Sequence, residues 1–95
     1  MATFVHAGFR VDDYDEWKKG FDASLPQRQI AGEVSYQVLR SVDDDSHLTV
    51  VSVLKNVALV KAFMNVPNYV EMMKASGVSE LGQRFLLEEV DSGKH

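Results

Sequence analysis

The sequence contains no cysteine. This absence excludes a disulfide scaffold, a zinc site with thiolate ligands and a thiol nucleophile. No apolar run approaches the roughly 20 residues that a membrane-spanning helix needs. Basic residues are also outnumbered, because 10 Lys and Arg stand against 14 Asp and Glu and give a net charge of −4. That sign is wrong for a protein that follows the phosphates of a nucleic acid.

The first residues lack the basic segment and long apolar stretch of a signal peptide. We therefore expect a cytoplasmic protein that binds neither nucleic acid nor a membrane. The composition is ordinary for a globular protein, with 45% hydrophobic and 25% charged residues among 95. A chain of this length holds one modest hydrophobic core. We expect a single domain over residues 1–95.

The first third of the chain predicts a strand followed by a helix. Residues 3–11 are rich in β-formers and nearly alternate in polarity. One face of this strand carries Val5, Ala7, Phe9 and Val11, and the other carries Phe4, His6, Gly8 and Arg10.

A helix is expected to begin at Asp13, because Glu16 follows three residues later in the manner of a capping box. Its apolar stripe consists of Tyr14, Trp17, Phe21 and Leu25. Pro26 should interrupt or kink the helix near Leu25, since proline lacks an N–H and clashes with the preceding turn. The helix resumes through Arg28 and ends at Gly32.

Two strands follow. Residues 33–42 alternate apolar and polar side chains, which suits the edge of a sheet. Residues 47–55 are apolar on both faces, which suits a central strand. Residues 43–46 form the hairpin loop between them.

The last segments predict a broken helix and a final strand. Asn56 is a suitable N-cap, and Pro67 breaks the helix and begins a second piece that ends near Gly77. Residues 83–90 form the last strand.

The order is therefore βαββαβ, a ferredoxin-like α+β fold with a four-stranded antiparallel sheet. Right-handed crossovers place the strands 3–11 and 47–55 in the middle of the sheet.

Two helices on one face of the sheet leave the opposite face open to water. That face would show Phe4 and one row of the third strand, either Thr49, Val51 and Val53 or Leu48, Val50 and Leu54. An apolar patch of this kind usually marks an interface. We expect a homodimer in which two sheets face each other across a two-fold axis.

Four stretches of the sequence resemble a known family, namely residues 11–17, 36–40, 63–72 and 75–78. They are similar to the dimeric α+β barrel superfamily, and more closely to small bacterial proteins of the antibiotic-biosynthesis-monooxygenase-like or cyclase-like kind. The resemblance implies two ferredoxin-like units paired into a barrel, with a ligand cleft between the sheet and the helices of each subunit. Characterised members of the superfamily include cofactor-independent oxygenases of aromatic polyketides, haem-degrading oxygenases, isomerases and decarboxylases. The chain departs from close relatives at Phe9, where they often have a histidine.

Five residues are candidates for a ligand site between the sheet and the helices: Arg28, Tyr36, Phe63, Tyr69 and Met72. The break at Pro67 favours a gap beneath the second helix, and methionine adapts well to the wall of a gap. The Tyr36 hydroxyl can orient an acceptor, and Arg28 can anchor an anionic or enolisable compound. In the alternative interpretation the aromatic and methionine side chains belong to the core and Arg28 extends to solvent.

Two further polar features are interpreted as structural. His6 has the chemistry of a general base, but on a covered sheet face it is more simply a hydrogen-bonded interface residue. The run 43–45 lacks the glycine and distal glutamate of a calcium loop and is interpreted as a solvated turn. No catalytic residue is assigned, and no metal site is expected.

Two classes of function fit these observations. The first is an enzyme that needs no bound cofactor, such as a monooxygenase, isomerase or cyclase acting on an aromatic or polyketide-like compound. The protein would mainly deprotonate the substrate, orient it and shield it from water. The second is a non-catalytic dimeric ligand-binding or accessory module. The enzyme needs a cavity with at least two convergent polar groups.

Overall fold

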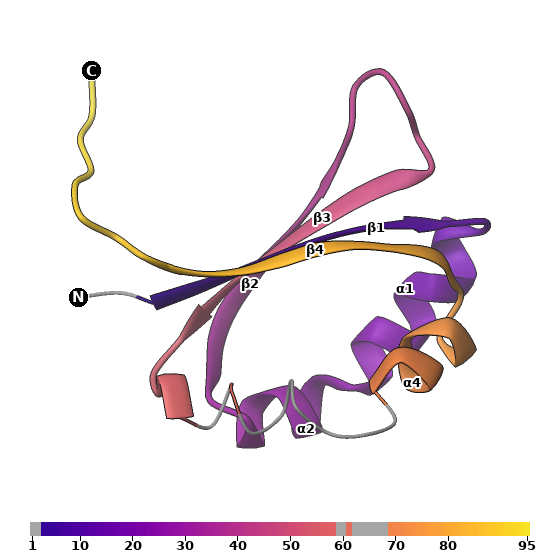
Figure 1. Cartoon of the computed structure of the whole chain (residues 1–95), viewed down its shortest axis with the longest axis horizontal. Helices are drawn as coiled ribbons and strands as arrows, with labels where there is room; N and C mark the ends of the chain where they lie inside the picture. Colours follow the sequence, from indigo (N-terminus) through magenta and orange to yellow (C-terminus); the bar gives the residue numbers. More distant parts are fainter. Residues whose placement is uncertain (1–2, 59–60, 62–68) are drawn as a thin grey trace.

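The computed structural model describes residues 3–58, 61 and 69–95. A four-stranded sheet forms one layer, and the helices α1, α2 and α4 lie along one of its faces (Figure 1). The predicted ferredoxin-like α+β architecture is confirmed. In the described part of the chain, no helix has the length and apolar character needed to cross a membrane. The elements are β1 (Thr3–Val11), α1 (Tyr14–Ala23), α2 (Leu25–Ile30), β2 (Glu33–Arg40), β3 (His47–Leu54), α4 (Tyr69–Ala75) and β4 (Val78–Glu88).

The strand order is β2-β3-β1-β4, and each neighbouring pair is antiparallel. The prediction that the first and third strands are central is confirmed. Both are hydrogen-bonded on two sides, as the continuously apolar sequence of β3 requires.

The break between the first two helices has a local cause. The Asp13 side chain accepts a hydrogen bond from the Glu16 amide at 3.2 Å and caps α1 as predicted. The helix ends at Ala23, and Ser24 separates it from α2, whose first turn contains Pro26. A proline is tolerated in a first turn because the amide there has no partner within the helix. Gly32 follows α2 with a φ of 100°, which is the left-handed stop expected there.

The prediction for the last strand was wrong at its start. Residues 83–90 were expected, whereas β4 runs from Val78 to Glu88. Glu80 and Gly82, near the start of β4, are weak strand formers, but this segment pairs with β1, as in Arg10↔Glu80. Tertiary pairing therefore overrides local propensity. The register shifts between Ala7 and Phe9, where an added Cβ at Gly82 would lie 2.5 Å from the Gly8 carbonyl oxygen.

The structure describes the second helical region only at its beginning and at its end. The Ala58 amide donates to the Asn56 side chain at 2.9 Å, as an N-cap requires. α4 is followed by Gly77 with a φ of 102°, in agreement with the predicted stop. The predicted break at Pro67 lies outside the described residues.

The hydrophobic core lies between the sheet and the helices. The structure settles which row of β3 faces the helices, because Leu48, Val50 and Leu54 are all buried. The predicted inward row of β1 is also confirmed, with Phe9 and Val11 at 3% and 2% exposure. The buried cluster comprises Phe9, Val11, Trp17, Leu48, Val50 and Val78.

The opposite side of the sheet, called here the open face, carries a second apolar set. Phe4 pairs with Val53 and Leu87, and His6 pairs with Val51 and Phe85. Directly paired residues of antiparallel strands point to the same side, so these side chains share one surface. The open face consists of Phe4, His6, Thr49, Val51, Val53, Phe85 and Leu87.

Candidate functional site

A cavity of about 540 Å³ lies between the sheet and the helices. Its floor is formed by inward side chains of β1 and β3, among them Ala7, Phe9 and Val50. α1 contributes Trp17 and Phe21 to the wall, and α4 contributes methionines. The described lining is mostly apolar, which suits a ligand with a large hydrophobic surface.

Aromatic rings form a continuous run along the cavity. The Trp17 ring lies 5.3 Å from that of Phe9 and 4.9 Å from that of Phe21, measured between ring centroids. The Phe21 ring meets the Tyr36 ring edge-on at 5.1 Å. Offset and edge-on pairs of this kind are favourable beyond their buried area. Trp17 is 3% exposed, so it is at once a core residue and part of the cavity wall.

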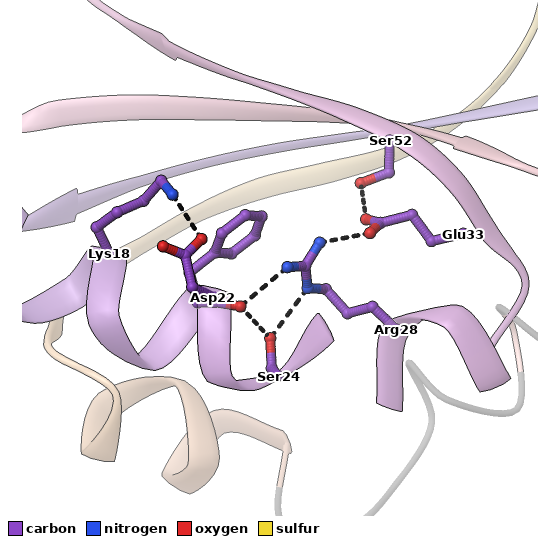
Figure 2. A network of polar contacts seen from close by, with 7 residues as sticks. Lys18, Asp22, Ser24, Arg28, Glu33 and Ser52 are labelled. Atoms are coloured by element: carbon purple, nitrogen blue, oxygen red, sulfur yellow. Dashed lines mark hydrogen bonds and ion pairs between the residues drawn. The ribbon is translucent and has the colours of Figure 1, made fainter. Parts of the chain in front are cut away.

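A polar cluster interrupts the apolar wall where α2 meets β2. Figure 2 shows Arg28 between Ser24 and Glu33, with Ser52 on the far side of the Glu33 carboxylate. Arg28 Nε donates to Ser24 Oγ at 2.9 Å, and Arg28 Nη1 forms an ion pair with Glu33. Ser52 Oγ donates to the other Glu33 oxygen at 2.9 Å. All four residues line the cavity, and the Arg28 and Glu33 side chains are 13% and 7% exposed.

The Arg28 guanidinium is also fixed by rings and backbone. Its central carbon lies 3.8 Å from the centroid of the Phe21 ring and 4.9 Å from that of Tyr36. Nη2 donates to the Phe21 carbonyl oxygen at 2.9 Å. Contacts on the ring faces and in the plane of the guanidinium hold the group in one orientation.

Hydrogen bonds with Ser46 and Arg10 hold the acidic loop, residues 43–46, in place. Hydrogen bonds from the Ser46 hydroxyl and from the Arg10 guanidinium lower the pKa of Asp44 to about 2, from an ordinary value of 3.8. These bonds favour the ionised carboxylate. Across residues 3–58, 61 and 69–95, no group of three or more His, Asp or Glu side chains is arranged to hold a metal ion.

The family models and the curated proteins contain no match to this chain. Solved structures do match it. A candidate antibiotic biosynthesis monooxygenase from Bordetella bronchiseptica has a TM-score of 0.74 at 18% identity, over 94% of this chain and 97% of that one. SnoaB, a cofactor-independent oxygenase from Streptomyces nogalater, has a TM-score of 0.70 at 15% identity, over 96% and 94%.

Rv0793 from Mycobacterium tuberculosis has a TM-score of 0.59 at 18% identity, over 99% of this chain and 100% of that one. The chain has the fold of the antibiotic biosynthesis monooxygenases. One fold hosts many activities, so these similarities establish the architecture alone.

Within this fold, the structure brings together only some of the predicted site residues. Arg28 and Met72 line the cavity. Tyr36 lies behind the wall against Phe21 and Arg28, and it is 39% exposed. Phe63 lies outside the described residues, and Tyr69 begins α4 without a described side chain.

The sequence did not identify Glu33 and Ser52 as part of this site. Glu33 follows Arg28 by five residues across a helix end, and Ser52 is on the neighbouring strand, with Tyr36↔Ser52 and Glu33↔Leu54 as nearby pairs. The sequence signal that could have identified Glu33 was its opposite charge at a short distance after Arg28. The pairing register of β2 and β3, which brings Ser52 to Glu33, is not encoded locally.

His6 does not belong to the cavity. It lies on β1 in the outward row, opposite Val51 on one side and Phe85 on the other. Its position on the open face agrees with the interpretation that it is a residue of a covered surface rather than a base in the cleft.

Proposed function

We propose that this protein binds an aromatic or polyketide-like small molecule in the cavity between its sheet and its helices, and acts on it as a cofactor-independent monooxygenase or cyclase. The observation that carries the proposal is the cavity itself. Its volume of about 540 Å³ falls within the range typical of small-molecule sites. The aromatic run beside it offers ring faces to a flat substrate.

The polar cluster gives this cavity the convergent groups that catalysis needs. Arg28, Glu33 and Ser52 all line it, and hydrogen bonds hold each in place. A guanidinium can stabilise an oxyanion, and an apolar enclosure keeps water from a reactive intermediate. The solved neighbour SnoaB is itself named a cofactor-independent oxygenase, which supports the same class of reaction here.

The proposal includes a homodimer formed through the open faces. Phe85 and Leu87 are 49% and 42% exposed in the single chain, beside the partly buried Phe4 and Val53. If a second copy packed its open face against this one, the apolar side chains of both copies would be covered. A stable contact of this kind should bury more than about 1,000 Å² in total.

A non-catalytic binding or accessory module is the second candidate. It is favoured by the way the Arg28 and Glu33 charges neutralise each other, and by the absence of histidine from the described lining of the cavity. Such a module would bind the same class of compound without turning it over.

An NMR titration tests the binding part of the proposal. A panel of flat phenols, aromatic acids and quinones is added to 15N-labelled protein, and backbone shifts are mapped. We expect shifts at Trp17, Gly20 and Ser52, which line the cavity. Oxygen consumption, together with chromatography that detects conversion of the compound without oxygen, then separates enzyme from module. If no compound in the panel shifts any cavity residue, the proposed site is wrong.

A further inference from the structure

His6 is a half-buried, titratable side chain that lies among apolar residues. It belongs to the open face, where it is paired with Val51 of β3 and with Phe85 of β4. In its own row of β1 it follows Phe4 and precedes Gly8, which has no side chain. The described lining of the cavity on the helix side does not include His6, so the proposed reaction makes no use of its chemistry.

The charged groups on this side of the sheet lie at one end of the strands, away from His6. Arg10 is paired with His47 of β3 and with Glu80 of β4, so these three side chains are neighbours. Arg10 Nε lies 3.9 Å from a carboxylate oxygen of Glu80, and Arg10 also forms an ion pair with Asp44. Arg10 is four positions beyond His6 on β1, which corresponds to about 13 Å of extended strand.

The edge strand β2 adds no charge to this side. Ser35, Gln37 and Leu39 are the residues that it places next to Val53, Val51 and Thr49. Among the described strand residues on this side, Glu80 is therefore the one acidic group, and Arg10 balances it. Two copies of this surface can meet without like-charge repulsion, although the whole chain has a net charge of −4. This balance favours a second copy of the chain as the partner of the open face.

Protonation of His6 would introduce a charge into such a contact. Histidine is the side chain that ordinarily takes up its proton between about pH 5 and pH 8. In a single chain the open face is exposed, and water can solvate an imidazolium there. Between two open faces the same cation would be enclosed by side chains such as Val51 and Phe85, with no described carboxylate of its own chain beside it. Because burying an unpaired charge is unfavourable, the neutral imidazole is the form that fits the contact.

We infer that His6 makes the pairing of two open faces sensitive to pH, so that two copies associate when its imidazole is neutral and separate when it is protonated. The inference rests on the homodimer of the proposed function. The dimer binds fewer protons than two single chains, so dissociation increases as the pH falls. Each copy contributes one His6, and both imidazoles must be neutral in the closed contact.

Sedimentation velocity over a range of protein concentrations measures the dissociation constant of the dimer. For the wild-type protein we expect this constant to be at least about tenfold larger at about pH 5.5 than at about pH 7.5. Circular dichroism at both pH values checks that the chain stays folded. Asp44 has a pKa of about 2, so its contacts are unchanged in this window.

His6→Gln is the decisive variant, because glutamine is polar and cannot be protonated in this range. Its dissociation constant should differ by less than about twofold between the two pH values. His47→Gln removes the other histidine on this side of the sheet and should keep the wild-type response. His95→Gln is the matched control, because His95 lies in the exposed tail beyond β4, and it should also keep the response.

Equal dissociation constants for the wild-type dimer at the two pH values overturn the inference and leave the homodimer intact. Tighter association at the lower pH also overturns it, since a carboxylate would then have to face His6 in the dimer. A response that persists in His6→Gln, or that disappears in His47→Gln, assigns the effect to another group and overturns it as well. A single chain at both pH values contradicts the homodimer of the proposed function, and the inference fails with it.

Discussion

The two faces of the sheet carry similar apolar residues, but these residues are buried on one face and partly exposed on the other. On β3, Leu48, Val50 and Leu54 are buried against the helical layer. Val51 and Val53 alternate with them along the same strand, but no described element covers them. On the open face Phe85 and Leu87 are 49% and 42% exposed. The apolar sequence of a strand therefore predicts that both of its faces are covered, but it does not identify what covers each face.

The proposed functions give the two faces separate roles. The helix-side face encloses a cavity with a fixed polar cluster, whereas the open face carries apolar side chains on β1, β3 and β4 around His6. An enclosed cavity with convergent polar groups suits a small ligand. A broad apolar surface suits a second protein surface. The following predictions test this division, beginning with the largest effect.

Trp17→Ala should cause the largest loss on the helix side. Trp17 is 3% exposed and packs against Phe9, Tyr14 and Phe21. Truncating it should lower the free energy of unfolding by about 3–5 kcal/mol, measured by urea denaturation. Ile30→Ala is the control, because Ile30 is 79% exposed, and its effect should be small. A loss below about 1 kcal/mol for Trp17→Ala would mean that the ring only borders an empty cleft.

Removing one member of the buried ion pair should lower the free energy of unfolding more than replacing both members. Glu33→Leu leaves the Arg28 guanidinium buried without its partner, which should cost about 3 kcal/mol. Arg28→Met/Glu33→Leu removes both charges and should be close to the wild type in stability. Denaturation of the two variants side by side measures this. Equal losses in both would show that the pair acts through packing rather than through charge.

Phe85→Asp should act on assembly rather than on the stability of the single chain. Phe85 is 49% exposed, so the free energy of unfolding of the monomer should change by less than about 1 kcal/mol. In the proposed dimer the new carboxylate would be buried without a partner, and light scattering should report the monomer mass. Val42→Asp, at a position that is 98% exposed, should leave the mass unchanged. A monomeric wild-type protein at micromolar concentration would contradict the assigned role of the open face.

The smallest effect concerns the acidic loop, which lies away from both functions. The folded-state pKa of Asp44 is about 2, below its ordinary 3.8, because Ser46 and Arg10 favour the charged form. Its contribution to stability is therefore present above about pH 4 and is lost as the pH falls toward 2. Asp44→Asn should flatten the pH dependence of unfolding in that window alone. An identical pH profile for the variant would show that these contacts do not stabilise the fold.

Much of the fold followed from local pattern. The cap at Asp13, the stops at Gly32 and Gly77 and the inward row of β1 were all predictable, because each depends on a residue and its near neighbours. The start of β4 was not predictable, because Glu80 and Gly82 are weak strand formers and this segment joins the sheet through its pairing with β1.

The place of the cavity was predictable from the sequence, but the polar groups that line it were not. A ligand site between sheet and helices was expected, and Arg28 and Met72 do line the cavity there. The partner that neutralises Arg28 was missed, because Glu33 lies beyond the end of α2, where the left-handed Gly32 turns the chain into β2. Ser52 was missed because its position depends on the register of two strands.

The central claim is that the two faces of one sheet have different partners, a small molecule on the helix side and a second copy on the other. NMR shift mapping with 2-naphthol tests it most directly. The account predicts shifts at cavity residues such as Trp17, Gly20 and Ser52, with the side-chain signals of Phe4, Val51 and Phe85 unchanged. Shifts confined to Phe4, Val51 and Phe85 would contradict it.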